Sequence, residues 1–460
     1  MLDADRPVGG RPGPLAHRVN ISVLIVSVCA LFAGLSCPSE TAEFGSVPSG
    51  PDGALTIFLT GSELGSLRPC GCSGGQLGGL EKRPAVFDTV PASRRLIVET
   101  GGFVQNDREQ DLMKFGILFE ALRLLGYDTV HLTNHDVGIA ERLGLLTDTP
   151  QPFEIFQEGH DGQSPVFVRR FESLGRDVLV NIASFDPHVS PLERAGVLFK
   201  EAPGALTVDI LILRHCDPGS LGVLAARLRG VECVVCPSDT DEPRLLSGPG
   251  EIPLVFTVGR FGRHICRLDV AFPEPRGEPV VRFEPIPVEA TLADDEALLR
   301  LYSQYQQLVS SSTLLEDYPR IPLPQGLAFA GSKSCERCHE YEYDMWSTKA
   351  HADALASLNE VGSDRDPECV ICHVVGMNYD RGFISQEKTP HLKDVGCENC
   401  HGPGSEHIRT LGQVATRQPQ MACLDCHTPE KSTGFAGHEE EYMQKIVHWR
   451  EPAADRDVKE

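Results

Sequence analysis

Four copies of the pattern Cys-x-x-Cys-His lie in the last third of this chain, and they constrain it more than any other feature. They are Cys335–His339, Cys369–His373, Cys397–His401 and Cys423–His427. The pattern is the attachment signal for c-type haem, because two thiols three positions apart reach the two vinyl groups of one porphyrin. The His that follows is then held under the ring and ligates the iron. Four such patterns, each with its His in place, predict four covalently bound haems.

Paired cysteines have other uses, and these are weaker explanations here. Zinc ribbons also contain Cys-x-x-Cys pairs, but a zinc site does not require a His directly after every second Cys. A disulfide scaffold is disfavoured because residues three apart form strained bridges. The predicted thioether-forming residues are Cys335, Cys338, Cys369, Cys372, Cys397, Cys400, Cys423 and Cys426, and the predicted proximal iron ligands are His339, His373, His401 and His427.

Cysteine usage and the N-terminus both predict export. The chain has 460 residues, long enough for two or three domains, and its 16 cysteines are many for a cytosolic enzyme. Covalent haem attachment takes place on the outer side of the bacterial membrane. Three arginines precede an apolar run over residues 21–35, which is shorter than the roughly 20 residues of a spanning helix. We therefore expect residues 1–37 to be a signal peptide and the protein to reach the periplasm or the outer face of the envelope.

A lipid anchor attached to Cys37 is a second expectation. It directly follows small residues that suit a cleavage site, although Gly34 stands where lipoprotein signals usually carry Leu. An uncleaved anchor helix stays open as an alternative. The formal charge of −23 disfavours nucleic acid and anionic membrane surfaces as partners. Redox proteins are the expected partners.

Composition shifts divide the rest of the chain. Residues 38–53 are rich in Ser, Pro and Gly and are expected to be a linker, followed by a first domain over residues 54–311. A Pro-bearing second linker over 312–330 leads into a haem domain over 331–449, and residues 450–460 form a tail.

In the first domain, apolar runs and helical periodicities alternate, which indicates an α/β sheet with helices on its faces. Three later runs have no helices between them and predict an antiparallel extension. Expected strands are residues 54–60, 96–100, 129–132, 178–182, 208–213 and 233–236, expected helices are 111–125, 220–228 and 292–308, and the later runs are 254–258, 264–270 and 280–283.

The order of strands and loops over about residues 55–283 resembles the metallophosphatase fold of periplasmic 5′-nucleotidases. The resemblance rests on the stretches LTIFLTGS, PCGCSGGQLGGLEKR, VETGGF, LTNHD and ILILRH. It implies a layered α/β sandwich. It also implies two metal ions at the strand ends, which would activate water for phosphate ester hydrolysis.

Most ligand positions implied by this resemblance are changed. Ser62 and Leu64 stand where the first Asp-x-His would be, Gly102 stands where a bridging Asp would be, and the distal Gly-His-x-His is absent. The residues that match are Asn134, His135 and His215. Three polar residues cannot hold two divalent ions, so we expect a phosphatase fold without phosphatase chemistry. A purely structural role for the two histidines stays open.

Cysteines stand near the changed positions. Cys70 and Cys72 lie in the loop that would hold the first ligands, and Cys233 and Cys236 lie where the last ligands would be. The loop resembles that of nucleotidase-like redox proteins with a cysteine or selenocysteine at its first position. The four thiols are predicted either to bind a metal or to form disulfides, redox-active or structural, and Cys216 could join them.

Residues 331–449 resemble the cytochrome c-554 family of multihaem cytochromes. The resemblance rests on CERCH followed by two tyrosines and a tryptophan, and on CVICHVVG, VGCENCHGPGSEH and CLDCHTPE. In that family the second axial ligand is usually a His from elsewhere in the chain. The matching positions are His351, His407 and His448. For the fourth iron, the second axial ligand could be His391 or a Met such as Met377, or the position could be open.

About 120 residues cannot bury a large apolar core around four porphyrins, so the haems themselves are expected to be the core of a mainly helical domain. The favoured function is electron transfer by an exported tetrahaem cytochrome whose first domain serves docking or a thiol or metal redox site. The alternative is an oxidoreductase that acts on a small nitrogen or sulfur species, at an open haem or at the cluster of Cys70, Cys72, Cys233 and Cys236. Phosphate ester hydrolysis is the least favoured reading.

Overall fold

The computed structural model describes residues 55–69, 75–147, 151–173, 176–191, 194–195, 198–199, 205–217, 226–228, 230–248, 250–273, 279–429 and 431–450. The predictions for the signal peptide, Cys37, the first linker, Cys70, Cys72 and the tail from 451 onward lie outside these residues, as does most of the helix expected over 220–228. Among the helices it describes, none is long and apolar enough to cross a membrane.

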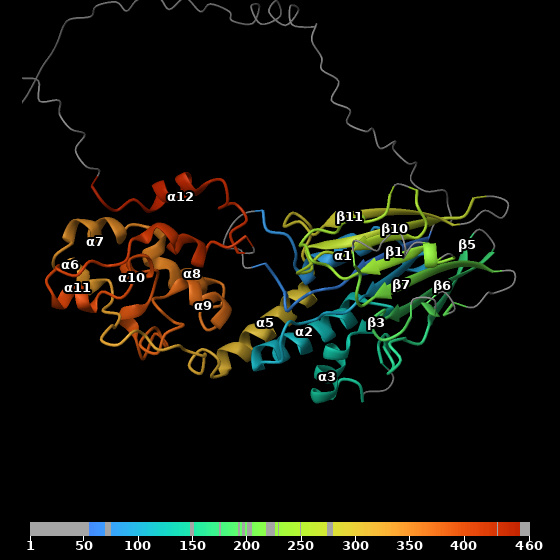
Figure 1. Cartoon of the computed structure of the whole chain (residues 1–460), viewed down its shortest axis with the longest axis horizontal. Coiled ribbons are helices and arrows are strands. Elements are labelled where there is room, and N and C mark those ends of the chain that lie inside the picture. Colours follow the sequence, from blue (N-terminus) through green and yellow to red (C-terminus); the bar gives the residue numbers. More distant parts are fainter. Residues whose placement is uncertain are drawn as a thin grey trace, which may run out of the picture. The chain divides into compact units, whose positions relative to one another are not determined.

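Two sheets form the first part of the chain (Figure 1). The six-stranded sheet has the order β11-β10-β1-β2-β3-β4. Its strands are β1 Leu55–Thr60, β2 Arg95–Glu99, β3 Thr129–Leu132, β4 Glu154–Gln157, β10 His264–Ala271 and β11 Val280–Pro287. Strands β1 to β4 pair in parallel, whereas β10 pairs antiparallel with β1 and with β11. The expected antiparallel extension is confirmed for β10 and β11.

The five-stranded sheet has the order β5-β6-β7-β8-β9. Its strands are β5 Phe167–Ser173, β6 Arg176–Phe185, β7 Leu206–Leu213, β8 Cys233–Cys236 and β9 Leu254–Thr257. The prediction for β9 was wrong, because β9 pairs in parallel with β8. The connection between them is long enough for a crossover, and a parallel pair needs that length rather than a helix.

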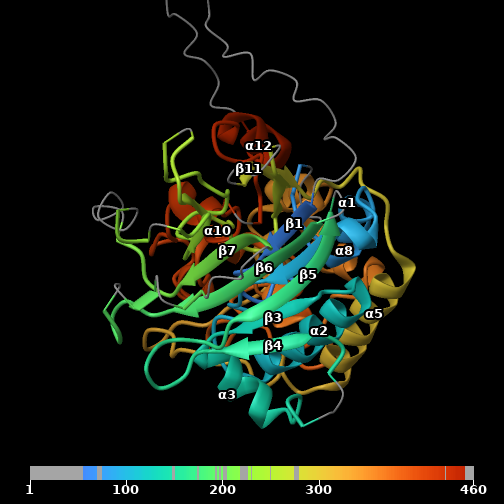
Figure 2. The ribbon, with the colours of Figure 1, turned by 90° about the vertical axis from the view of Figure 1, so that its right-hand side faces the viewer.

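Three apolar clusters show that the sheets and helices form layers, which confirms the expected α/β sandwich. One cluster lies between the six-stranded sheet and helices α2 (Glu109–Leu125) and α5 (Glu296–Ser311), a second lies between the sheets, and a third covers the outer face of the five-stranded sheet. Figure 2 shows α2, α5 and α3 (Asn134–Arg142) on one side of the strands. Strand β1 is buried on both faces, since Phe58 faces the helices while Ile57 faces the other sheet. Such burial explains its uninterrupted apolar sequence.

The last part of the chain consists of short helices, as expected. They are α6 Lys333–Glu336, α7 Glu340–Trp346, α8 Ala354–Glu360, α9 Pro367–His373, α10 Cys397–His401, α11 Ser405–Arg409 and α12 Glu439–Ile446. Shorter helical turns in this part are η6 Ala350–Asp353, η7 Pro390–Leu392 and η8 Pro419–Asp425. The first part of the chain also has three short helical segments, which are η2 Leu80–Lys82, α1 Arg83–Phe87 and η3 Ala92–Arg94. One small apolar cluster lies in the last part of the chain, around Val370 and Val374. Its size agrees with the expectation that apolar side chains alone do not make this core.

Polar side chains of α2 and α5 contact the start of α9, which carries the second haem motif. Tyr305 donates to Asp366 at 2.8 Å, and Gln110 donates to the other oxygen of the same carboxylate at 2.8 Å. Lys114 forms an ion pair with Glu368 at 2.6 Å. These bonds fix the beginning of α9 against the two helices.

Candidate haem sites and the polar strand ends

Short helices place the haem motifs. His373 and His401 are the last residues of α9 and α10, so the two cysteines of each motif lie one helical turn apart on the same helix. Helix α9 begins with Asp366, whose side chain accepts a hydrogen bond from the backbone of Glu368 at 2.9 Å, and continues with Pro367 at its first position. Both are favoured starts of a helix.

Three imidazole pairs join a motif histidine to a histidine that the sequence predicted as a second axial ligand. The ring centres of His339 and His407 lie 6.0 Å apart with an angle of 28° between the planes. A further two pairs, each with ring centres 6.4 Å apart, are His351 with His427 and His401 with His448.

This separation fits one iron between the two rings of each pair. A metal–imidazole bond measures about 2 Å, and the bonded nitrogen lies about 1 Å from its ring centre, which gives roughly 6 Å across a metal with two axial imidazoles. Rings in direct van der Waals contact would lie closer together. The residues present therefore fit three haem irons with two histidine ligands each.

Hydrogen bonds orient several of these rings. Nδ1 of His373 lies 2.6 Å from the carbonyl oxygen of Ala354, and Nδ1 of His407 lies 2.8 Å from that of Val414. Nδ1 of His448 lies 2.9 Å from the carbonyl oxygen of Ile446. A carbonyl oxygen only accepts, so each Nδ1 carries the hydrogen and each Nε2 keeps its lone pair for a metal.

Burial favours the neutral form that an iron ligand needs. It lowers the pKa of His351, of His401 and of His427, in each case chiefly because a charged imidazolium would lose water. Nearby histidines lower the pKa of the first two further. All three rings therefore offer a lone pair at neutral pH.

The histidine of the second motif differs from the other three. Within the described residues, no second imidazole faces the ring of His373 in a recorded ring contact, whereas the other motif histidines each have one. His391 is exposed, and Met377 is 1% exposed within the small apolar cluster. The second ligand of this iron stays a prediction, with His391, Met377 and an open position as before.

Thiols of different motifs contact one another. The thiol of Cys335 in the first motif lies close to that of Cys397 in the third, and the thiol of Cys372 in the second lies close to that of Cys426 in the fourth. Each thiol marks one edge of the porphyrin it would hold. The first and third haems would therefore be neighbours, as would the second and fourth.

A cavity of about 1160 Å³ lies beside the second motif. Its wall includes Cys369 and Ile371 of α9 together with Lys114 of α2 and Tyr302 of α5. Burial raises the pKa of the Tyr302 phenol to about 12, so this group stays neutral. The first part of the chain thus supplies one side of the space next to a predicted haem.

At the end of β1, an ion pair occupies the place of the ligands lost from the nucleotidase pattern. Glu63, between Ser62 and Leu64, accepts two bonds from Nη2 of Arg83 at 2.6 and 2.7 Å, and both side chains are 1% exposed. A Cβ on Gly102 would lie 3.3 Å from Cα of Ser62, at a φ of 84° that disfavours any side chain. An Asp at position 102 would therefore be strained.

The ion pair continues into a buried hydrogen-bond chain. Nη1 of Arg83 donates to the Tyr127 hydroxyl at 2.9 Å, which lies 2.7 Å from the hydroxyl of Thr60. Thr60 donates to Glu99 at 2.5 Å. Burial, with help from the charge of Glu63, raises the pKa of Glu99 to about 8. Sequence reasoning missed Arg83, because nothing local marks an arginine that pairs with a loop 20 residues away.

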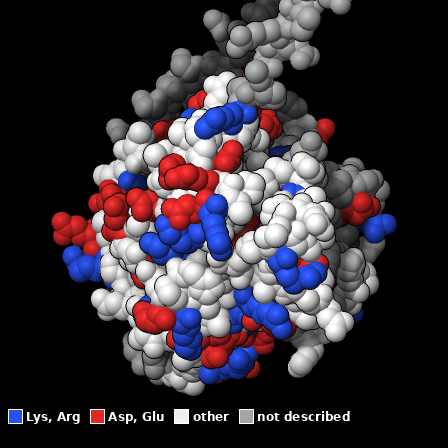
Figure 3. All heavy atoms as spheres, turned by 90° about the vertical axis from the view of Figure 1, so that its left-hand side faces the viewer, with Lys and Arg blue, Asp and Glu red and all other residues white. Residues whose placement is uncertain are grey.

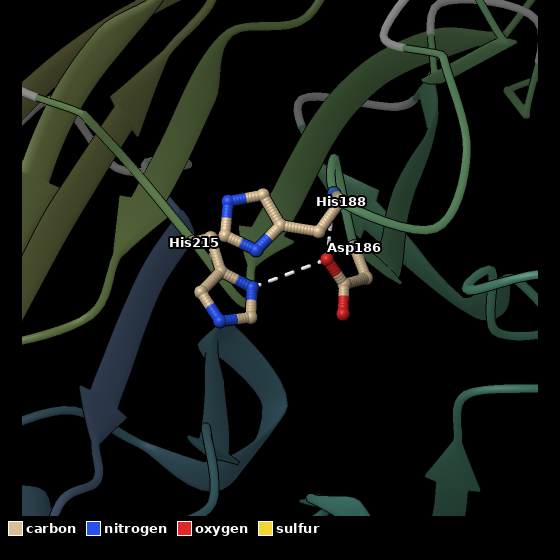
Figure 4. A group of neighbouring side chains, drawn as sticks. All are labelled: Asp186, His188 and His215. Atoms are coloured by element: carbon tan, nitrogen blue, oxygen red, sulfur yellow. Dashed lines mark hydrogen bonds and ion pairs between the residues drawn. The ribbon is translucent and has the colours of Figure 1, made fainter.

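Three other polar side chains meet where β6 and β7 end (Figure 4). The ligand atoms of Asp186, His188 and His215 all lie within 4.8 Å of one another. His215 was singled out from the sequence, whereas Asp186 and His188 were not. Asn134 and His135, the other matching residues, are exposed at the start of α3 and do not belong to this group of three.

The two cysteines of β8 do not come together, and one of them forms a disulfide, which is one of the alternatives that the sequence left open. Cys236 forms a disulfide with Cys216. Cys233 is buried without a disulfide in the layer between the sheets, whereas Cys236 lies in the cluster on the other face. The two residues point to opposite faces because side chains alternate along a strand. Cys70 and Cys72 lie outside the described residues.

Comparisons with known proteins bear on the haem region. The sequence profile of a family described as cytochrome c554 and c-prime matches residues 334–402, which hold three of the four motifs. The curated cytochrome c-554 of Nitrosomonas europaea is 34% identical over 112 residues, or 21% of this chain and 44% of that protein. The chain thus spans less than half of that relative's length.

Several solved hydrolases are similar to this chain in fold. The calcineurin-like phosphoesterase YfkN from Bacillus subtilis has 12% identity and a TM-score of 0.39, covering 56% of this chain and 98% of that one. A 5′-nucleotidase precursor from Thermus thermophilus has 17% identity and a TM-score of 0.42, covering 67% and 68%. The sulfate thiohydrolase SoxB from the same organism has 15% identity and a TM-score of 0.41, covering 57% and 62%. Likenesses this distant say nothing about what the chain binds or hydrolyses.

The family match covers three of the four haem motifs, and each of the three imidazole pairs has one histidine inside the matched segment. The C-terminal part of this chain is therefore similar to the cytochrome c-554 family over residues 334–402, and similarity to a c-type cytochrome implies covalently bound haem.

Proposed function

We propose that this protein is an exported electron carrier with four covalent haems. The observation that carries the proposal is the set of three imidazole pairs at 6.0 to 6.4 Å, each joining a motif histidine to a second histidine. An iron with two histidine ligands is low-spin and suited to passing electrons rather than binding substrate. The axial ligands would be His339 with His407, His401 with His448 and His427 with His351, and His373 would hold the fourth iron.

Contacts between the motifs support one order of electron transfer. The thiol contacts join the first haem to the third and the second to the fourth. Cys400 of the third motif and Cys423 of the fourth lie within electrostatic range of each other. Electrons would therefore pass between haems in the order first, third, fourth, second.

The first part of the chain serves docking in this proposal and hydrolyses nothing. An arginine supplies the positive charge beside Glu63 in place of metal ions. On the C-terminal face drawn in Figure 3, acidic and basic side chains are interspersed with uncharged areas. A lipid on Cys37 would hold the protein at the envelope.

The test is a haem count and the spin state of each iron in the full chain, produced with cytochrome maturation machinery. We expect four haems per chain from pyridine haemochrome absorbance and mass, and at least three low-spin ferric signals. Replacing His351 (His351→Ala) should convert one low-spin iron to high-spin, whereas the control His438→Ala, at an exposed histidine, should convert none. A colourless product, or an unchanged spectrum in His351→Ala, would refute the ligand assignment.

A second function, reduction or oxidation of a small nitrogen or sulfur species, rests on the cavity beside the second motif. Its volume of about 1160 Å³ exceeds the roughly 300–1,000 Å³ of ordinary ligand pockets, so part of a porphyrin and a small molecule fit together. Pro69 and Gly75, which flank the loop of Cys70 and Cys72, also line it. Cys369, one of the two cysteines that would hold this haem, lines the same space.

Reduced protein should then bind CO at one haem of the four, with a shifted Soret band. A thiol role predicts in addition that the double variant Cys70→Ser/Cys72→Ser keeps CO binding but loses haem reduction by a dithiol donor. No CO binding would leave electron transfer as the sole function.

A further inference from the structure

Three strand ends bring polar side chains together in the first part of the chain. Glu158 directly follows β4, Asp186 directly follows β6, and Arg214 and His215 directly follow β7. His188 lies two residues beyond Asp186. The carboxyl ends of parallel strands are where α/β folds bind ligands. Neither the predicted haem chemistry nor the buried Glu63–Arg83 pair uses any of these five residues.

Two imidazoles and a carboxylate converge within this group (Figure 4). Nδ1 of His215 lies 3.1 Å from Oδ1 of Asp186, and the same oxygen accepts from the backbone of His188 at 2.8 Å. The rings of His188 and His215 stack with centres 3.9 Å apart. Two histidines and a carboxylate are a common ligand set for one divalent transition ion.

A buried carboxylate next to the group points to the same ligand. The side chain of Glu158 is 2% exposed, and its Oε1 has no hydrogen-bond partner. The nearest recorded cation is Nε of Arg214, at 3.7 Å, which is beyond hydrogen-bond distance. The charges of Asp186 and His215 both act on this carboxyl group. Leaving such an oxygen unpaired is costly, and a bound cation removes that cost.

We propose that Asp186, His188 and His215 bind a single divalent transition ion such as Zn²⁺ or Fe²⁺. Glu158, whose carboxyl group feels the charge of Asp186, is the residue to test as a fourth ligand or as an acceptor for a bound water. The site is not the metal pair of nucleotidases. Of its residues, His215 alone matches that pattern, and Asn134 and His135 take no part.

The geometry needs little adjustment to hold an ion. Ligands at a tetrahedral metal with bonds of about 2.1 Å lie about 3.4 Å apart, and the present atoms are within 4.8 Å of one another. Side-chain movements of at most about 1.4 Å would close the difference, and the rings of His188 and His215 are both exposed. Asp186 stays in place, because two hydrogen bonds hold its Oδ1.

The test is Zn²⁺ binding to the full-length haem-loaded protein, stripped with a chelator and titrated calorimetrically at pH 7.5. Co²⁺ absorbance between 500 and 700 nm, read as a difference against the haem bands, reports the coordination number (about four ligands give intense bands). The variants are His188→Ala and Asp186→Asn. The matched control is His135→Ala, at an exposed histidine that the nucleotidase pattern singles out. All measurements are made in a Cys70→Ser/Cys72→Ser background, which removes the competing thiols.

We expect one Zn²⁺ per chain, weakened more than about tenfold by His188→Ala and by Asp186→Asn and unchanged by His135→Ala. The variant Glu158→Gln separates the two roles proposed for Glu158. A loss of affinity for Zn²⁺ would show that Glu158 is a ligand, and an unchanged affinity would show that it accepts from a bound water. Circular dichroism and the haem spectrum show whether each variant is folded. Equal affinity in His188→Ala and the parent means an adventitious ion only and overturns the proposal. Loss of binding in His135→Ala alone would place the ion elsewhere and overturns it too.

Discussion

A single guanidinium compensates the buried acidic groups at the ends of β1 and β2. Arg83 pairs with Glu63 through two bonds and reaches Glu99 through Tyr127 and Thr60. Removing one partner of a buried pair leaves the other charge without compensation, which typically costs about 3–5 kcal/mol. We therefore expect Arg83→Ala to lower the free energy of unfolding by about this amount in urea titrations followed by circular dichroism.

The matched control for this prediction is Arg142→Ala. Arg142 pairs with Asp107 at 2.9 Å, but their side chains are 52% and 67% exposed. Exposed pairs contribute about 0–1 kcal/mol, so this variant should unfold nearly as the parent does. Equal losses in the two variants would contradict the role given to Arg83.

Glu99 gives the stability of the first part a pH dependence. Burial raises its pKa to about 8 in the folded protein, whereas a Glu in an unfolded chain titrates near about 4.3. The folded state thus binds more protons between these values. The contribution of protonated Glu99 to stability is therefore complete below about pH 4 and is lost as the pH rises towards 8. Over this range the free energy of unfolding falls by up to about 1.4 kcal/mol per pH unit.

Replacing Glu99 by Gln should remove this decline. Urea midpoints of Glu99→Gln measured between pH 5 and 9 should change less with pH than those of the parent protein. The control is Glu154→Gln, at an exposed position on β4, which should keep the parental slope. A Glu99→Gln slope equal to that of the parent would show that Glu99 is ionised in the folded protein at neutral pH.

At the scale of elements, helix α9 depends on both parts of the chain. Its first-turn acceptor Asp366 bonds the backbone of Glu368 and also accepts from Tyr305 and Gln110. Asp366→Ala removes the cap, which costs about 0.5–2 kcal/mol, and leaves the buried hydroxyl of Tyr305 without its acceptor. We expect a larger loss of stability than for Asp295→Ala, which removes only the cap of α5.

The two variants should also differ in how they affect the haems. Asp366→Ala should shift the absorbance and potential of the haem held by α9, whereas Asp295→Ala should leave all haem signals unchanged. Redox titrations of the Soret band measure this difference. Identical titrations for the two variants would mean that the contacts to α2 and α5 do not position α9.

Elements with strong local patterns could be predicted from the sequence, and those set by distant contacts could not. The uninterrupted apolar run of β1 and the periodicity of α2 and α5 identified them. Strands β4 and β5 were missed because their polar positions hide the alternation, and no local signal marks β9 as parallel. The second axial histidines followed from a family pattern. Asp186 and His188 lie in the loop after β6, and the sequence does not show that this loop lies beside His215 at the end of β7.

At the scale of the whole molecule, the thiol contacts make the fourth haem the bridge between the second haem and the other two. Removing its attachment with Cys423→Ser/Cys426→Ser should therefore isolate the haem of His373 electrically. Removing the first haem with Cys335→Ser/Cys338→Ser, at the far end of the proposed order, should not. Both variants lose one haem, so a haem count of three confirms that each pair is matched.

The measurement is flash photolysis of CO from partly reduced protein. It requires that the haem iron held by His373 binds CO. CO holds the electron on that haem, and its release by light lets the electron move to the remaining haems, which appears as a rapid absorbance change before CO rebinds. We expect this phase in the parent and in Cys335→Ser/Cys338→Ser, and its loss in Cys423→Ser/Cys426→Ser, because electrons tunnel efficiently only between adjacent haems. Redistribution at an undiminished rate without the fourth haem would show that the electron leaves by another route, and the order drawn from the thiol contacts would be wrong.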